Sequence, residues 1–385
     1  MTATPSSSGT DERFLRDALR LARRGYGLTS PNPMVGAVLV RNGKVIGRGW
    51  HHRAGLPHAE IEAIRDAERR GARPAGATLY VTLEPCCTRG RTPPCTDAIV
   101  AAGIRRVVVG ATDPNPRHRG RAFELLRRAG VRVTHGLLAE ECARLNEAFN
   151  HWIVQGTPWV TVKAAMTLDG KIATAAGESK WITGEAARAF AMRLRFGADA
   201  VLVGVNTILA DDPSLTLRSR SGRPGSPRPR GLRRIILDSL ARTPTGARVV
   251  CDEHAALTTI VVGRAAPRSR VEALRRRVNV LLAPLRPGRG SEPRQIDLNW
   301  LLKRLGAEGV THLLVEGGGE VNASFLLQRL AHRIAFFYAP KILGGRSARR
   351  AVAGAGARSL EEALRLSELQ WRRLGPDWLL LARVG

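Results

Sequence analysis

One histidine and two cysteines in the N-terminal part of the chain have the residue types and order of a zinc-binding set. His58 belongs to the segment His58-Ala59-Glu60, and Cys86 and Cys95 each follow a proline further along. An imidazole and two thiolates make three protein ligands, and a fourth position left to water distinguishes a catalytic zinc site from a closed structural one. Bound zinc lowers the pKa of that water. Glu60 lies two residues after His58, where its carboxylate can transfer protons without binding the metal.

This set matches the signature of zinc nucleobase deaminases, H-x-E followed by P-C-x-x-C, with one departure. Eight residues rather than two separate Cys86 from Cys95. The alternative interpretation is a closed zinc site in which Cys87 supplies a fourth ligand. That alternative leaves Glu60 without a role and requires adjacent cysteines on one metal ion, which strains tetrahedral coordination. The sequence therefore favours a hydrolytic deaminase site.

Length and cysteine content suggest the class of protein and its compartment. A chain of 385 residues is long enough for two domains that each bury a core. The sequence has no run of ~18 apolar residues, so we expect no transmembrane helix and no membrane partner. The first ten residues lack the apolar segment of a signal peptide. Five cysteines is an odd number and three are assigned to zinc, so a reducing cytoplasm is the simplest interpretation.

The net charge of +28 raises the question of nucleic-acid binding. Arginine spread over solvent-exposed helix faces explains the same charge. The sequence does not interleave aromatic and basic residues in the way that base-stacking surfaces do. We therefore predict no nucleic-acid partner, and we assign part of the positive charge to phosphorylated small substrates.

Strand and helix patterns alternate through the N-terminal half, which predicts a mostly parallel sheet with helices on both faces. His58 and Glu60 then lie in the first turn of a helix, and Cys86 lies just beyond the end of a strand, where such folds place their sites. Asn42-Gly43 predicts a hairpin. The expected helices are 11–26, 59–70, 97–102, 120–129 and 137–152, and the expected strands are 35–40, 44–49, 78–83, 106–110 and 131–134.

A second α/β pattern begins after a boundary at residues 155–158. Its expected strands are 159–164, 200–204, 234–237, 257–262, 278–282 and 312–315, and its expected helices are 185–196, 298–305 and 321–330. Residues 218–234 are rich in Arg, Pro, Gly and Ser and are interpreted as a surface loop. The triple glycine Gly317-Gly318-Gly319 stands between a strand and a helix, a position that suits the phosphates of a nucleotide cofactor. Its spacing is not that of a Rossmann fingerprint, and many Gly-rich segments are only turns.

Motifs in both halves carry a resemblance to one known family. In the first half they are Pro31-Asn32-Pro33, Val35-Gly36, His58-Ala59-Glu60, Thr82 to Cys86, Gly90 to Cys95 and Asp113 to Pro116. In the second half they are Lys163, Leu168 to Lys171, Gly177 to Ser179, Trp181 to Thr183, Leu209 to Pro213, Val315 to Gly318 and Pro340 to Gly345. From about residue 12 onward the chain resembles the bifunctional riboflavin-biosynthesis deaminase/reductases. The resemblance implies a cytidine-deaminase-like three-layer α/β/α domain over residues 11–152 and a dihydrofolate-reductase-like α/β domain over residues 157–385.

For the first domain, the resemblance implies that His58, Cys86 and Cys95 bind Zn²⁺ and that Glu60 shuttles protons. The implied substrate contacts are Asn32 for the pyrimidine, Arg91 and Thr92, and Asp113 and Asn115 for the phosphate, with His51 at the pocket rim. Two departures from the family concern neighbours of the site. Cys87 stands where a serine is usual, and Thr88-Arg89 stands where a pair containing histidine is usual.

For the second domain, the resemblance implies an NADPH-dependent reductase with Lys163 near the reacting carbon. The implied NADPH contacts are Ala165, Trp181, Thr207, Asp211, Ser239, Gly318, Gly319, Glu320, Val321, Asn322, Ala323 and Ser324. The implied substrate contacts are Ser179, Arg195, Leu215, Arg218 and Glu316. Two arginines suit a ribose 5′-phosphate because arginine binds phosphate in a bidentate manner.

The implied function is two consecutive reactions on phosphorylated pyrimidines. The first is hydrolytic deamination of 2,5-diamino-6-ribosylamino-4(3H)-pyrimidinone 5′-phosphate, and the second reduces the ribosyl group of 5-amino-6-(5-phosphoribosylamino)uracil to ribityl. The alternatives are a zinc nucleoside or RNA deaminase with an unrelated C-terminal domain, and an RNA-binding zinc protein without catalysis. Glu60 and Lys163 argue against the second alternative. We expect a homo-oligomer.

Overall fold

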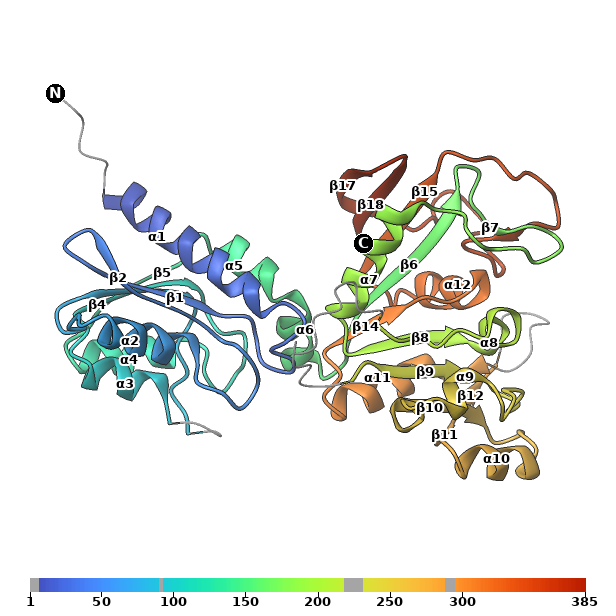
Figure 1. The fold of residues 1–385 in the computed structure, drawn as a ribbon, viewed down its shortest axis with the longest axis horizontal. Helices are drawn as coiled ribbons and strands as arrows, with labels where there is room; N and C mark the ends of the chain where they lie inside the picture. The colour runs from blue at the N-terminus through green and yellow to red at the C-terminus, as the bar shows by residue number, and fades with distance from the viewer. Residues whose placement is uncertain (1–6, 90–92, 218–230, 288–294) are drawn as a thin grey trace. The chain divides into compact units, whose positions relative to one another are not determined.

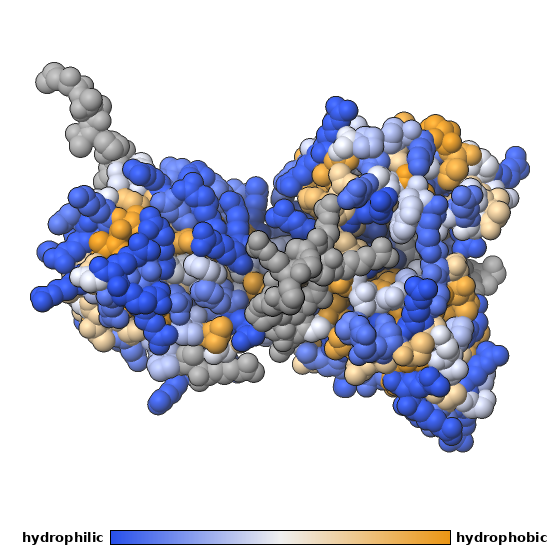
Figure 2. Space-filling model, viewed as in Figure 1, coloured by the Kyte–Doolittle hydropathy of each residue, from blue (hydrophilic) through white to orange (hydrophobic). Residues whose placement is uncertain are grey.

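The computed structural model describes residues 7–89, 93–217, 231–287 and 295–385. The chain divides into two compact units, Met1–Gly156 and Thr157–Gly385, which are described separately (Figure 1). None of the described helices is both long and apolar enough to cross a membrane. Hydrophilic side chains cover most of the face shown in Figure 2.

The first unit is built on a five-stranded sheet with the strand order β2-β1-β3-β4-β5. The strands are β1 (Gly36–Arg41), β2 (Lys44–Trp50), β3 (Thr78–Leu83), β4 (Arg106–Ala111) and β5 (Arg132–His135). β3, β4 and β5 are parallel, whereas β1 runs antiparallel to both β2 and β3. Asn42 and Gly43 join β1 to β2 with φ values of 50° and 73°, as a tight hairpin turn requires.

Helices cover both faces of this sheet. They are α1 (Ser7–Ala22), α2 (Ala59–Arg69), α3 (Cys95–Ala101), α4 (Arg121–Arg128), α5 (Ala139–Leu145) and α6 (Glu147–Gln155), with a short 3₁₀ turn at Arg23–Gly25. Figure 1 shows α1 and α5 over one face and α2, α3 and α4 over the other. Because strand side chains alternate, Ala37 and Leu39 of β1 pack on the α2 side while Val38 and Val40 pack on the α1 side. The predicted three-layer α/β/α arrangement is confirmed.

The prediction of one continuous helix over residues 137–152 is wrong, because the helix is interrupted at Asn146. α5 ends at Leu145 and α6 begins at Glu147. Asn146 between them has φ −116° and ψ 26°, outside the helical region. Its side chain bonds to the backbone of Met34, a contact between segments far apart in sequence that no local periodicity reveals.

The second unit is built on a nine-stranded sheet with the order β11-β10-β9-β8-β14-β6-β15-β18-β17. The strands are β6 (Trp159–Thr167), β8 (Ala200–Gly204), β9 (Arg233–Leu237), β10 (Thr258–Gly263), β11 (Asn279–Ala283), β14 (His312–Val315), β15 (Arg333–Ala339), β17 (Leu366–Leu374) and β18 (Asp377–Val384). The strands from β11 to β15 are parallel, and β18 and β17 complete the sheet antiparallel. β15, β17 and β18 were not among the expected strands; nearly all of β17 is exposed, so it lacks an apolar alternation.

Helices also cover both faces of the second sheet. α11 (Leu298–Ala307) and α12 (Gly319–Leu327) pack on one face, whereas α8 (Val205–Asp211), α9 (Arg248–Cys251) and α10 (Arg268–Arg275) pack on the other. α7 (Glu185–Phe196) packs against β15 and β18. A short 3₁₀ turn spans Ala255–Leu257. Two small sheets pair β7 (Lys171–Ala173) with β16 (Arg349–Arg350) and β12 (Leu285–Arg286) with β13 (Gln295–Ile296). The carboxyl ends of the parallel strands meet at one edge, where open α/β sheets place their ligands.

Candidate functional site

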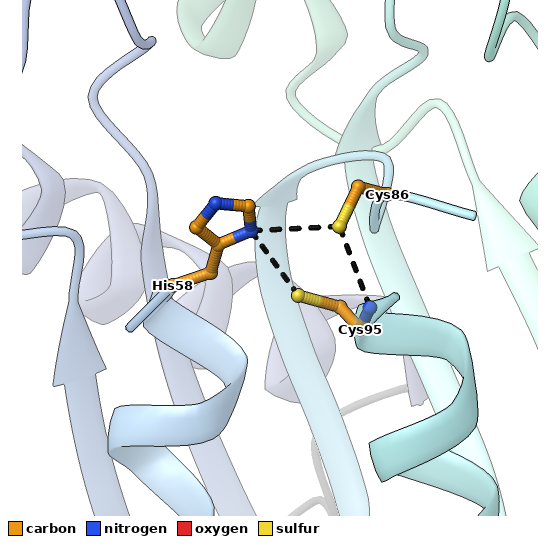
Figure 3. Close-up of side chains that lie close together, drawn as sticks. All are labelled: His58, Cys86 and Cys95. Atoms are coloured by element: carbon orange, nitrogen blue, oxygen red, sulfur yellow. Dashed lines mark hydrogen bonds between the residues drawn. The ribbon is translucent and has the colours of Figure 1, made fainter. Parts of the chain in front are cut away.

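His58, Cys86 and Cys95 come together in the first unit from three separate elements (Figure 3). His58 immediately precedes α2, Cys86 follows β3 and Cys95 begins α3. His58 Nδ1 lies 3.5 Å from Cys86 Sγ and 3.3 Å from Cys95 Sγ. The three potential ligand atoms lie within 4.8 Å of one another, and no other group of His, Cys, Asp and Glu among the described residues has this geometry.

These separations fit one tetrahedral zinc ion. Zinc–nitrogen and zinc–sulfur bonds of about 2.0 and 2.3 Å place a nitrogen and a sulfur ligand about 3.6 Å apart in a tetrahedron. The observed nitrogen–sulfur distances lie within a few tenths of an ångström of that value. Cys87 does not join the set, because its Sγ faces His118 Nδ1 at 3.6 Å. The three side chains therefore suit a zinc site with one open position.

Hydrogen bonds within the cluster shift the pKa values of the three potential ligands in different directions. Hydrogen bonding with Cys95 lowers the pKa of Cys86. The same interaction raises the pKa of the buried Cys95 thiol, and the hydrogen bond with Cys86 raises the pKa of His58. Zinc binding displaces protons from such ligands, so the cluster releases protons when the metal binds.

Glu60 is placed beside the ligands but outside the cluster. It lies in the first turn of α2, is 3% exposed and lines the same pocket as His58 and Cys86. Burial raises the pKa of its carboxyl group. A raised carboxyl pKa brings the group toward the range that suits proton transfer near neutral pH.

The pocket has a volume of about 420 Å³, within the usual range for small-molecule sites. Asn32, His51, Asp113 and Asn115 line it together with His58, Glu60 and Cys86. Arg91 and Thr92, also predicted to contact the substrate, lie outside the described residues.

The amide of Asn32 has a defined orientation. His51 Nδ1 lies 3.1 Å from Pro57 O, and His51 Nε2 lies 3.1 Å from Asn32 Nδ2. Because a carbonyl only accepts, His51 donates from Nδ1 and its Nε2 accepts from the Asn32 amide. Burial lowers the pKa of His51 to about 4, which agrees with a neutral ring. Asn32 Oδ1 is therefore the acceptor atom that this amide offers to the pocket.

Glu84 fixes the loop that carries Asp113 and Asn115. Its buried carboxylate accepts the backbone N–H groups of Asp113 at 3.1 Å, Gly120 at 2.9 Å and Ala122 at 3.1 Å. Asp113 Oδ1 in turn accepts the N–H of Asn115 at 2.9 Å, so Asp113 acts through the turn. The sequence analysis gave Glu84 no role of its own, because its partners lie some thirty residues away in the chain.

One wall of the pocket comes from α6, which the sequence analysis treated only as a connection. Phe149, Trp152 and Ile153 line the pocket. Their i, i+3, i+4 spacing is the signal that marks one face of a helix. That spacing identifies a face, but it does not show what the face contacts.

In the second unit, Lys163, Arg195 and Glu316 form a charged cluster. Lys163 lies on β6, Arg195 in the last turn of α7, and Glu316 directly after β14. Arg195 Nε and Nη2 donate to the two carboxylate oxygens of Glu316 at 2.8 and 2.7 Å, and Lys163 Nζ lies 3.9 Å from Glu316 Oε2. Although burial alone raises the pKa of Glu316, the charges of Arg195 and Lys163 outweigh it and lower that pKa to about 2.

Other predicted residues lie on neighbouring loops. Ser179 Oγ donates to Asp211 Oδ1 at 3.2 Å, and Lys180 Nζ lies 3.5 Å from the same oxygen. Arg195 Nη1 donates to the carbonyl of Thr216 at 3.1 Å, next to the buried Leu215. Arg218 lies outside the described residues.

Trp181 presents an aromatic face at the surface. Its side chain is 56% exposed, and the guanidinium carbon of Arg188 lies 4.8 Å from the centre of its ring. Lys341 Nζ donates to the carbonyl of Trp181 at 3.1 Å, which ties the loop that follows β15 to this residue.

The glycine turn after β14 contains three glycines with different surroundings. A Cβ at Gly317 meets Val321 at 2.5 Å, and one at Gly319 meets the carbonyl of Arg350 at 2.3 Å. A Cβ at Gly318 has nothing within 4 Å. Gly317 and Gly319 are therefore needed for packing, whereas Gly318 opens on space at the N-terminus of α12, where unpaired N–H groups favour a phosphate.

The remaining predicted NADPH contacts follow the carboxyl edge of the sheet. Ala165 lies on β6, Thr207 on α8 just after β8, and Ser239 just after β9. Glu320, Val321 and Ser324 lie on α12, with Ser324 Oγ donating to the carbonyl of Glu320 at 2.8 Å. Asn322 and Ala323 are buried, and Asn322 Nδ2 donates to the carbonyl of Ala351 at 2.8 Å.

Comparison with known families assigns a class to each unit. The model of the cytidine and deoxycytidylate deaminase zinc-binding region matches residues 8–111, and the model of the RibD C-terminal domain matches residues 158–380. The fold and the two sites thus define a zinc-dependent deaminase domain followed by a reductase domain.

Full-length relatives carry the same two domains. The riboflavin biosynthesis protein RibD of Aquifex aeolicus is 43% identical over 371 residues, covering 96% of this chain and 97% of that one. The Escherichia coli K12 protein of the same name is 38% identical over 374 residues, covering 95% and 97%. The structure of Acinetobacter baumannii RibD superposes with a TM-score of 0.85 at 34% identity, covering 98% of this chain and all of that one.

The chain belongs to the RibD family of riboflavin-biosynthesis proteins. It is a bifunctional enzyme, a zinc-dependent deaminase and an NADPH-dependent reductase.

Proposed function

We propose that the first unit, over residues 11–152, deaminates 2,5-diamino-6-ribosylamino-4(3H)-pyrimidinone 5′-phosphate and that the second, over residues 157–385, reduces the product. A solved Thermotoga maritima relative, 33% identical with a TM-score of 0.79, is described as a diaminohydroxyphosphoribosylaminopyrimidine deaminase and 5-amino-6-(5-phosphoribosylamino)uracil reductase. The observation that carries the proposal is the placement of Glu60 in one pocket with His58 and Cys86, two members of the cluster that Cys95 completes.

In the deamination, His58, Cys86 and Cys95 would hold zinc, and a bound zinc would supply a water of lowered pKa beside the carbon that bears the 2-amino group. Glu60 would accept the proton of that water and deliver it to the ring nitrogen, and would then carry the proton of the added hydroxyl to the departing amine. The carbon–nitrogen bond breaks, a carbonyl forms and ammonia leaves. Asn32 Oδ1, held by His51, accepts a hydrogen bond from an N–H group of the pyrimidine.

The phosphate end of the substrate is assigned to the part of the pocket that Asp113 and Asn115 line. Glu84 holds the backbone of the loop that carries Asp113 and Asn115, and Arg91 and Thr92 complete the proposed contacts. Asp113 already accepts a backbone N–H from its own turn, so it shapes the loop and does not face the phosphate as an unpaired charge.

In the reduction, bound NADPH would be the source of the hydride that C1′ of the ribosyl group gains. Lys163 is the proposed proton donor to the ribose oxygen, and Glu316 holds the ammonium in its charged form. Arg195 orients Glu316 through two parallel hydrogen bonds, and Arg195, Ser179, Leu215, Arg218 and Glu316 are the proposed substrate contacts.

NADPH is proposed to follow the carboxyl edge of the sheet. Its phosphates are assigned to the turn at Gly318 and the first turns of α12, through Gly319, Glu320, Val321, Asn322, Ala323 and Ser324. Ala165, Trp181, Thr207, Asp211 and Ser239 are assigned to the rest of the cofactor. The open space at Gly318 supports the phosphate position.

One assay separates the two activities. The diaminopyrimidine phosphate is supplied with and without NADPH, and ammonia release and NADPH oxidation are followed independently. Ammonia release without NADPH, followed by NADPH oxidation when the cofactor is added, supports the assignment. Absence of ammonia release from zinc-loaded protein contradicts it.

We also propose a cytoplasmic homo-oligomer. Cys86 and Cys95 must remain reduced to bind zinc, and a cytoplasm keeps thiols reduced. Light scattering of the purified protein measures the oligomeric state directly.

A further inference from the structure

Asn146 stands at the start of α6 but does not cap that helix. Asparagine at this position commonly accepts an N–H group of the first helical turn. Here the side chain makes no such bond. Asn146 Oδ1 accepts the N–H of Met34 at 2.7 Å, and Asn146 Nδ2 donates to the carbonyl of Met34 at 2.9 Å. One buried amide thus binds both polar groups of a single distant residue.

The two segments that this amide joins both line the deaminase pocket. Asn32 and Val35, on either side of Met34, line it from one direction. Trp152 and Ile153, on the helix that begins after Asn146, line it from another. The carbonyl of Asn146 also accepts the N–H of Asn150 at 2.8 Å in the first turn of α6. The Asn146 amide therefore fixes the loop of residues 31–35 and the pocket-lining face of α6 relative to each other.

We propose that Asn146 is a positioning residue for deamination, which acts by clamping the loop of residues 31–35 to α6. Asn32 must hold its acceptor oxygen within hydrogen-bond reach of the pyrimidine, and loosening a contact that substrate and transition state share raises KM with little change in kcat. Because the helix is interrupted between α5 and α6, the Asn146 side-chain amide reaches Met34 and does not cap α6. This proposal rests on the deaminase function proposed above.

Asn146→Ser tests the clamp with the helix preserved. Serine is a good residue at the start of a helix, so α6 keeps its N-terminus, but serine is too short to bond both groups of Met34. We expect faster hydrogen exchange at the Met34 amide, unchanged zinc content, and a KM for the diaminopyrimidine phosphate raised about 10-fold with kcat changed less than about threefold. Asn146→Asp keeps an acceptor for the Met34 N–H but has no donor for the Met34 carbonyl. The KM of this variant should therefore lie between those of the wild type and Asn146→Ser.

Asn150→Ser is the matched control. Asn150 lies one turn further along α6, and its Nδ2 donates to the carbonyl of Ala143 at 3.0 Å, which joins α5 to α6 without contact to the loop. Asn150→Ser also removes one buried amide, but it should leave the KM for the diaminopyrimidine phosphate unchanged. NADPH oxidation with the deaminated uracil substrate, measured on the same preparations, should be the same in all variants.

The outcomes separate the clamp from the proposed function. Wild-type protein that releases no ammonia overturns the deaminase assignment itself. An active wild type, with Asn146→Ser showing fast Met34 exchange and an unchanged KM, overturns the clamp alone. A fall in kcat in proportion to the folded fraction, again with unchanged KM, shows a purely structural role and also overturns it.

Discussion

At the scale of single residues, the proposed zinc ligands are distinct from the proposed proton carrier, Glu60. Glu60 is buried beside the cluster, and the three ligand atoms meet without it. Glu60→Gln should retain stoichiometric zinc and lose deamination by about 100-fold or more, the usual order for a general acid/base. Metal analysis and ammonia release on the same sample measure both quantities. Loss of zinc in this variant makes Glu60 a ligand and contradicts the assignment.

The charged cluster of the second unit gives a prediction for acid stability. The pKa of Glu316 is about 2 in the folded protein, below the ordinary carboxyl value. A lowered folded-state pKa contributes stability that is complete above the unfolded value, about 4.5, and is lost as the pH falls toward 2. Glu316→Gln should therefore reduce the free energy of unfolding of this unit by on the order of 3 kcal/mol at pH 7, and it leaves the buried Arg195 unpaired.

Urea titrations of wild type and Glu316→Gln at a series of pH values test this account. The difference between the two proteins should be constant from pH 8 to about 5 and shrink below about 4.5. A difference that grows as the pH falls contradicts the charge arrangement.

Sequence motifs predicted the zinc ligands and Glu60 because their chemistry depends on residue types at short spacings. The orientation of the Asn32 amide depends on His51 and Pro57, and the loop that carries Asn115 depends on Glu84. These contacts join segments that only the folded sheet brings together, so no local pattern in the chain indicates them.

At the scale of elements, the glycines of the turn between β14 and α12 differ in role. Gly317 and Gly319 are needed for packing, whereas Gly318 is the proposed phosphate position. Gly318→Val adds a side chain in open space at the proposed phosphate position. It should raise the KM for NADPH about 5- to 150-fold, as a loss of about 1–3 kcal/mol requires, and leave deamination intact. Steady-state NADPH oxidation measures the first effect and ammonia release the second.

Gly319→Ala is the control for this turn. A Cβ at position 319 lies 2.3 Å from the backbone carbonyl of Arg350. The substitution should therefore lower the stability of the second unit. Unchanged NADPH kinetics in Gly318→Val place the cofactor away from this turn.

Elements with strong local periodicity were predicted well, among them β3, α7 and β8, whose bounds agree with the structure. The break at Asn146 and the exposed strand β17 were not predicted. In the first case a tertiary hydrogen bond overrides helix propensity, and in the second an edge strand has no buried face to produce an apolar alternation.

At the scale of the whole molecule, each compact unit contains its own site residues. The described residues of the first unit include the zinc cluster and its pocket, and those of the second include Lys163 and Glu316. A chain that ends near Gly156 should therefore fold, bind zinc and deaminate without NADPH. Insoluble or metal-free protein from that shorter chain, with the full chain active, contradicts autonomous domains.

The large positive charge belongs to the same scale. A protein that binds RNA through phosphate contacts shows an affinity that falls steeply with salt. We expect only weak RNA binding to this chain, because its arginines are interpreted as solvated surface residues and not as a base-stacking groove.

The central claim is that one chain carries two sites that act in sequence, and NADPH oxidation by the Glu60→Gln variant tests it most directly. The variant is given either the diaminopyrimidine phosphate or its deaminated uracil product, each with NADPH. The account predicts almost no oxidation with the first compound and a wild-type rate with the second, because only deamination needs Glu60. Wild-type oxidation with the first compound, or none with the second, contradicts two sites acting in this order.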